Sequence, residues 1–154
     1  MQWNPKEFER WEELRQFVDT ALLPLYLFRP DLEMADHVLR MNYLLNVAAG
    51  IERRLRGRVL LFPLLYHFSN EWNTEVMPPG FAHRVLLCFA GDRIHLPQSG
   101  ERLLVLTVGE EDLDSSLRFD VTVDVLYKEV IRQWQQEQKA RADLSIEKPV
   151  SGNT

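Results

Sequence analysis

Residues 21–28, ALLPLYLF, and residues 59–66, VLLFPLLY, are two short apolar runs that decide the fold of this chain. Neither run alternates polar with apolar side chains, and each is too short for a core helix, so we predict two strands buried on both faces. Between them, residues 32–56 have the pattern of an amphipathic helix that begins after Asp31 and ends before Gly57. Strand, helix and strand in this order predict a βαβ unit.

The long helix between these strands is expected to pack on the sheet through a broad apolar face. We predict that one stripe of this face contains Ala35, Val38, Leu39, Asn42, Leu45, Ala49 and Leu55. A second stripe, which widens the face, contains Leu44, Val47, Ala48 and Ile51.

The rest of the chain supplies a second pair of strands and two further helices. Residues 84–90 and 102–108 read as buried strands, and antiparallel pairing or a helix-free crossover both fit the short connection between them. Residues 5–18 have helical spacing. Residues 119–125 alternate as a strand would, yet their apolar positions continue at helical spacing, so we favour a helix from about Asp120 to about Arg141.

These elements predict one α/β domain over residues 1–143, with a small, open, mainly parallel four-stranded sheet and helices packed on its faces. Residues 144–154 are polar and contain Pro149 and Gly152. We therefore expect a disordered tail there.

Composition limits the classes of function. The 154 residues carry a net charge of −5, whereas a general nucleic-acid binder needs a basic footprint. Cys88 is the sole cysteine, so no disulfide can form within the chain. The first residues do not have the design of a signal peptide, and neither apolar run approaches the ~20 residues of a membrane span. We expect a soluble, cytoplasmic protein with no membrane insertion and no nucleic-acid partner.

Two motifs resemble those of a known family. Residues 17–25, FVDTALLPL, and residues 51–63, IERRLRGRVLLFP, are similar to signatures of the YpiF-like family of small uncharacterised proteins from Gram-positive spore-formers, and Trp3 is a further similarity. The chain departs from that family's pattern between Asp92 and Glu101, where a helical, tryptophan-bearing insertion is missing. The family has no assigned activity, so the resemblance implies no mechanism.

Polar residues follow the ends of the predicted strands, where an open α/β sheet binds its ligands. The ligand candidates are Asp31, His67, Asp92, Glu110 and Asp112. Carboxylates from several strand ends could gather around a hard cation such as Mg²⁺. The simpler interpretation is that these acidic residues cap helices and keep loops soluble. No glycine-rich phosphate loop follows residues 21–28, which argues against a classical dinucleotide enzyme.

The irregular segment 67–82 carries the candidates for a protein interface, namely Phe68, Trp72 and Met77. Exposed aromatic side chains are typical anchors of interfaces, and Trp72 is hard to place in a core. We expect a non-enzymatic accessory or interaction protein, with no catalytic residues and no cofactor. The alternative is a small metal- or ligand-dependent enzyme or binder that uses the carboxylates at the strand ends, with Mg²⁺ as its cofactor.

Overall fold

The computed structural model describes residues 1–68, 79–92, 94 and 103–146, and its five strands form one open sheet in which every pairing is parallel. The strands follow the order β2-β1-β4-β5, and β3 also pairs with β1. In chain order the elements are α1 (Pro5–Phe8), α2 (Trp11–Leu14), β1 (Thr20–Leu27), α3 (Met34–Arg54), β2 (Val59–Leu61), β3 (Leu65–His67), β4 (His83–Phe89), β5 (Leu103–Val108), the 3₁₀ helix η2 (Glu110–Asp112) and α4 (Ser116–Ile146). The predicted α/β class and parallel sheet are confirmed.

The predicted βαβ unit is present, but its second strand is divided into β2 and β3. β2 pairs with the first half of β1 and β3 with the second half, so residues 62–64 interrupt the ladder. Phe62 N–H donates to Leu22 C=O, which shows that the even residues of β1 direct their backbone groups towards this edge. Pro24 is one of these residues and has no N–H to donate, which helps to explain the break, and Pro63 lies within the interruption.

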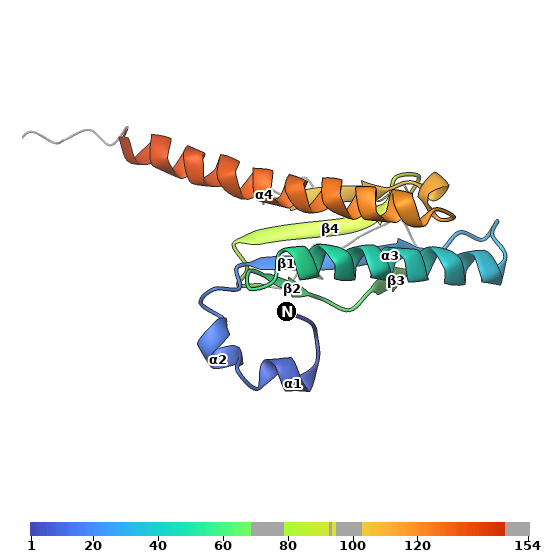
Figure 1. Cartoon of the computed structure of the whole chain (residues 1–154), viewed down its shortest axis with the longest axis horizontal. Helices are drawn as coiled ribbons and strands as arrows, with labels where there is room; N and C mark the ends of the chain where they lie inside the picture. Colours follow the sequence, from blue (N-terminus) through green and yellow to red (C-terminus); the bar gives the residue numbers. More distant parts are fainter. Residues whose placement is uncertain (69–78, 93, 95–102, 147–154) are drawn as a thin grey trace, which may run out of the picture.

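Both long helices cover the same face of the sheet (Figure 1). Leu22 and Tyr26 of β1, together with Val85, Leu87 and Phe89 of β4, form a core with α3 and α4 on this face. The two helices contact each other directly, because Gly50 of α3 lies against Val123 of α4. α3 is thereby held over β1, with its first residues at the carboxyl end of that strand.

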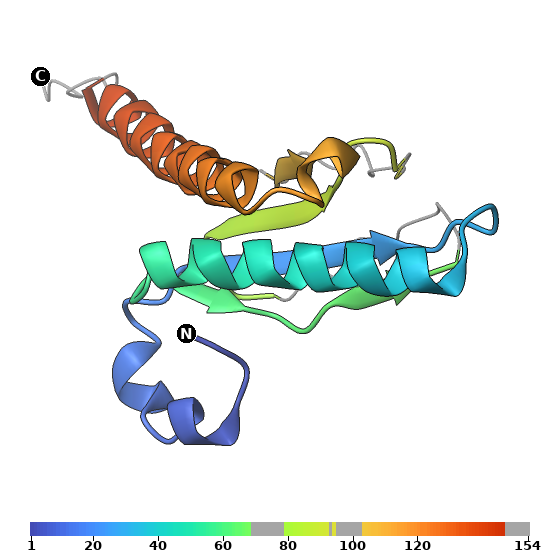
Figure 2. The same cartoon turned by 45° about the vertical axis from the view of Figure 1, so that its right-hand side comes forward.

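The opposite face of the sheet is apolar as well. Leu23, Leu25 and Leu86 form a cluster there. The predicted helix over residues 5–18 consists of the two short helices α1 and α2 (Figure 2). Their apolar side chains pack around Met1, Val18 and Leu60. These helices lie at the β2 side of the sheet.

The apolar face predicted for α3 is wrong for most of its first stripe, in which Leu55 is the one buried member, and right for its second. Leu44, Val47, Ala48 and Ile51 are fully buried, whereas the side chains of Val38 and Leu45 are 64% and 41% exposed. Polar residues, among them His37 and Arg40, take part of the buried side of the helix. These residues have partners at the end of the sheet, so burial follows polar contacts as well as hydrophobicity.

α4 settles the conflict over residues 119–125 in favour of a helix, and it is longer than predicted. Val123 is buried, whereas Val121 and Val125 are exposed. The helix continues to Ile146, so residues 144–146 are not part of a tail, and residues 147–154 lie outside the described residues. Its 31 residues span about 46 Å, compared with about 23 Å for the seven residues of β4. The helix therefore extends past the strands (Figure 2).

Candidate functional site

The carboxyl ends of β1, β4 and β5 form the candidate site, because the strand order reverses between β1 and β4. The chain leaves β1 through α3 to β2 and β3 on one side, and β4 and β5 lie on the other. In open α/β sheets this switch point is where ligands bind. Asp31 follows β1, Asp92 follows β4 and Glu110 follows β5.

Arg40 of α3 lies at the centre of this site. Its side chain is only 3% exposed, and its Nη2 donates to Oδ1 of Asp92 at 3.4 Å. Its Nη1 contacts Oε1 of Glu110. The guanidinium also lies over the ring of Phe89, 4.1 Å from the ring centroid. A stacked and paired guanidinium is an energetically acceptable way to bury this charge.

Arg29 extends the network to the surface. Its Nη1 donates to Oε1 of Glu110 at 3.2 Å, and its Nη2 donates to Oδ2 of Asp31 at 3.1 Å. Glu110 therefore holds one carboxylate oxygen against two guanidinium groups. Asp31 and Glu110 are 62% and 50% exposed, so the pairs made by Arg29 contribute little to stability.

The two ends of this network differ in their electrostatics. Burial raises the pKa of Asp92, although the nearby charges of Arg40 and Arg29 act in the opposite direction. At the exposed end, the hydrogen bond from Arg29 lowers the pKa of Asp31. When all three carboxylates are ionised, they exceed the two guanidinium groups by one negative charge.

Three buried polar atoms in this region have no hydrogen-bond partner among the described residues. They are Nε of Arg40, Oδ2 of Asp92 and Nε2 of His37. His37 is 3% exposed; its Nδ1 contacts the hydroxyl of Tyr26, and its ring stacks on that of Phe28 at 4.6 Å. Buried groups normally find partners, so unpaired atoms at a switch point are typical of a binding site.

The structure brings together three of the five predicted ligand residues. Asp31, Asp92 and Glu110 are linked through the two arginines. Asp112 instead contacts α4, where Thr122 Oγ1 donates to it at 3.4 Å. His67 ends β3, and its C=O accepts from the N–H of Phe28.

The guanidinium of Arg40 lies between Asp92 and Glu110, where the sequence suggested a metal ion. Across residues 1–68, 79–92, 94 and 103–146, no three His, Cys, Asp or Glu side chains are placed to hold a metal ion. The two arginines, which already hold the carboxylate of Glu110, are suited to the recognition of anionic groups.

An aromatic surface lies beside the polar network, on the β3 side of β1. We call Phe28, Tyr66 and Phe68 the aromatic patch; their ring centroids are 4.9 to 6.2 Å apart. Phe68 is 75% exposed. On α3, Met34 and Val38 are exposed as well. The predicted interface residues Trp72 and Met77 lie outside the described residues.

A second polar cluster lies at the opposite ends of the strands and was not predicted. His83 of β4 is flanked by Glu137, with Nδ1 and Oε2 2.6 Å apart, and by Asp19, with Nε2 and Oδ2 3.7 Å apart. The orientation of the Nδ1 contact departs from that of a hydrogen bond. Asp19 also pairs with Arg58, which lies over Trp134. The cluster lines a cavity of about 430 Å³ and ties α4 to β1 and β4.

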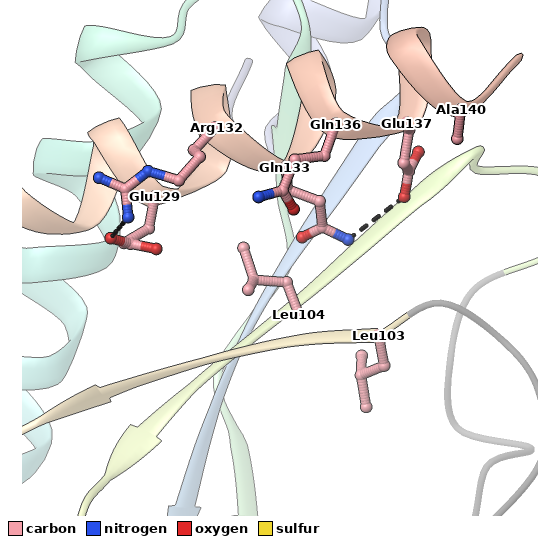
Figure 3. A pocket seen from close by; sticks show the side chains of 8 residues that line it. All are labelled: Leu103, Leu104, Glu129, Arg132, Gln133, Gln136, Glu137 and Ala140. Carbon is pink, nitrogen blue, oxygen red and sulfur yellow. Dashed lines mark hydrogen bonds and ion pairs between the residues drawn. The ribbon is translucent and has the colours of Figure 1, made fainter. Parts of the chain in front are cut away.

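Figure 3 shows a larger hollow between α4 and the start of β5, with a volume of about 490 Å³. Leu103 and Leu104 lie on one side of it. Arg132 and Gln133 on α4 pair with Glu129 and Glu137 of the same helix. Oε1 of Gln133 is the one buried atom of these side chains without a hydrogen-bond partner among the described residues, so the hollow offers less unpaired chemistry than the carboxyl ends of the strands.

The residue that sequence reasoning missed is Arg40. It lies three positions after His37 and four before Leu44, on the buried side of α3. A charged residue in register with Leu44, Val47 and Ile51 is a signal that could have identified it. The register of Arg40 was overlooked because Val38 and Leu45 belong to another apolar stripe of the helix, and both of these residues are exposed.

The fold and the site define a class: a small α/β protein with an open parallel sheet and a charged switch point. Within it, the chain belongs to the family described as "Protein of unknown function (DUF2487)", whose pattern matches residues 9–131. Comparison with curated proteins and with solved structures finds no match. Among the described residues, no helix combines the length and apolar character that crossing a membrane requires.

Proposed function

We propose that this protein is a non-enzymatic interaction protein of the cytoplasm that binds a protein partner through the aromatic patch. The observation that carries the proposal is the 75% exposure of Phe68 at the edge of three contacting rings. Leaving a phenylalanine in water forgoes the hydrophobic gain of its burial. A partner that covers the ring recovers this gain.

The surroundings of the patch indicate the chemistry of the partner. Met34 and Val38 on α3 are 70% and 64% exposed, lie one helical turn apart, and follow Phe28 of the patch in sequence. His37, between them in sequence, stacks on Phe28, so this turn of α3 lies next to the aromatic patch. An apolar segment with aromatic or aliphatic anchors would fit such a surface.

The experiment compares partner capture by the wild type, Phe68→Ala and Phe17→Ala. Phe17 is also an exposed phenylalanine, at 59%, and lies away from the patch, before β1. We expect Phe68→Ala to reduce capture of a specific partner at least tenfold and Phe17→Ala to leave it unchanged. Equal loss in both variants, or no partner in repeated captures, would contradict the proposal.

A second candidate function is a ligand-dependent binder or enzyme acting at the carboxyl ends of the strands. Three buried atoms, on Arg40, Asp92 and His37, favour it, because none of them has a hydrogen-bond partner in the residues that the structure describes. The test measures thermal stability with added Mg²⁺ or Mn²⁺, because a ligand that binds only the folded state raises its stability. Stabilisation that disappears in Asp92→Asn would support a cation ligand.

The motifs at residues 17–25 and 51–63 support a narrower placement of the chain among YpiF-like proteins. Parts of both motifs have structural reasons, because Pro24 lies in β1 between its pairings with β2 and β3, and Pro63 lies in the break between those two strands. Gly57, with φ of 102°, closes the loop after α3 in a conformation that favours glycine.

A further inference from the structure

Glu110 occupies a position that a ligand could take. Its carboxylate contacts Arg40 and Arg29 together, and these two arginines come from different elements, α3 and the loop after β1. The carboxylate belongs to the short helix η2 and is half exposed. It can therefore leave the arginines without disturbing the core.

We propose that Arg29 and Arg40 form a binding site for a carboxylate ligand and that Glu110 fills this site when the ligand is absent. The inference deepens the second candidate function, on which it rests, and gives its ligand a chemical class. A bound carboxylate would displace Glu110 and accept the same hydrogen bonds. Planar guanidinium groups match carboxylates in shape as well as in charge.

The burial of Arg40 is the observation that points to a ligand. At 3% exposure its Nε still has no hydrogen-bond partner within the described part of the chain, although Nη1 and Nη2 are engaged. Glu110 thus accepts from only some of the hydrogen-bond donors that Arg29 and Arg40 offer. A ligand carboxylate that moves deeper than Glu110 could reach the remaining donor, and a buried donor that gains a partner recovers a desolvation cost.

The charge of the site favours a carboxylate over a dianionic phosphate. Asp31 and Asp92 remain beside the arginines after Glu110 has left. Replacing one singly charged carboxylate by another preserves the net charge of the site, whereas a dianion adds one more negative charge next to Asp92. Like charges at this distance repel.

The test measures the thermal midpoint against increasing glutarate, with chloride at equal ionic strength as the reference. Removing the internal competitor in Glu110→Gln should lower the half-maximal glutarate concentration at least tenfold relative to the wild type. Adding Arg29→Gln to that variant should abolish the response; Arg29 is 36% exposed, so the protein should still fold. Glu129→Gln is the matched control, because it removes a carboxylate paired with Arg132 elsewhere and should leave the response unchanged.

Further ligands in the same assay distinguish the sources of the carboxylate, and they separate failure of this inference from failure of the second candidate function. A capped Ala-Glu-Ala peptide that matches glutarate identifies an acidic side chain of a partner protein as the ligand, and a response to glutarate alone identifies a small organic acid. A stronger response to inorganic phosphate overturns the carboxylate class. Stabilisation by Mg²⁺ that Asp92→Asn abolishes, without a glutarate response, overturns this inference and preserves the second candidate function. No response to any of these probes overturns both.

Discussion

The close approach of α3 and α4 at Gly50 makes a quantitative prediction about stability. A Cβ atom at this position would lie 2.9 Å from Cγ2 and 3.1 Å from Cγ1 of Val123. Favourable contacts between carbon atoms lie at about 3.5 to 4.0 Å. The two methyl groups of Val123 cannot swing away easily, because a valine in a helix strongly prefers one rotamer.

Two opposing effects determine the result of Gly50→Ala. Alanine in a helix is favoured over glycine by about 1 kcal/mol. Overpacking a well-packed contact costs about 1–3 kcal/mol. We therefore expect a net loss of up to about 2 kcal/mol. In a Val123→Ala background the clash is absent, so the same substitution should stabilise the protein by about 1 kcal/mol.

The assay is urea unfolding of the wild type, the two single variants and the double variant, which together form a double-mutant cycle. Asn46→Ala is the control, because residue 46 is an exposed position of the same helix and should gain a few tenths of a kcal/mol from propensity alone. The reasoning is refuted if Gly50→Ala stabilises the wild type, or if its cost is the same with Val123 present and absent.

Two further predictions concern ionisable groups. Burial raises the pKa of Asp92 in the folded state, so the folded protein holds this proton more tightly than the unfolded chain. Relative to Asp92→Asn, the wild type should therefore lose stability as the pH rises from about 4 through the folded-state pKa of Asp92. Urea unfolding of both proteins across this pH range measures the difference between their free energies of unfolding. A difference that does not change with pH would contradict the prediction. Burial also raises the pKa of the Cys88 thiol to about 11, and this residue is 4% exposed. A thiol reagent at pH 8 should react slowly with the folded protein and rapidly in urea, and fast labelling of the folded protein would show that the thiol is accessible.

The parallel sheet could be predicted from the sequence because buried parallel strands leave a strong local signal. Residues 21–28 and 59–66 are continuous apolar runs on either side of a helix, and this order specifies parallel pairing. The same reasoning located three of the charged residues at the switch point, since each follows a strand directly. The division of β2 from β3 was also accessible in principle, because Pro24 and Pro63 are visible in the runs.

The face of α3 could not be predicted, because burial there depends on partners that are distant in sequence. Arg40 is buried against Asp92 and Glu110, which lie 52 and 70 positions further along the chain. The spacing of apolar residues places Val38 and Leu45 on the buried face of the helix, but the folded chain leaves both exposed. Hydrophobic periodicity thus fails where a buried side chain is polar and paired.

The position of Arg40 also changes what the acidic cluster can do. Three carboxylates at strand ends suggest a cation site when they are considered alone, and the topology of the sheet does bring Asp31, Asp92 and Glu110 together. Helix α3 then supplies the guanidinium of Arg40, which pairs with Asp92 and Glu110, whereas Asp31 pairs with Arg29. A preorganised pair of arginines favours anions. The chemistry expected at this switch point therefore follows from which side chain α3 directs at the strand ends, and only the packing of α3 against β1 and α4 determines that direction.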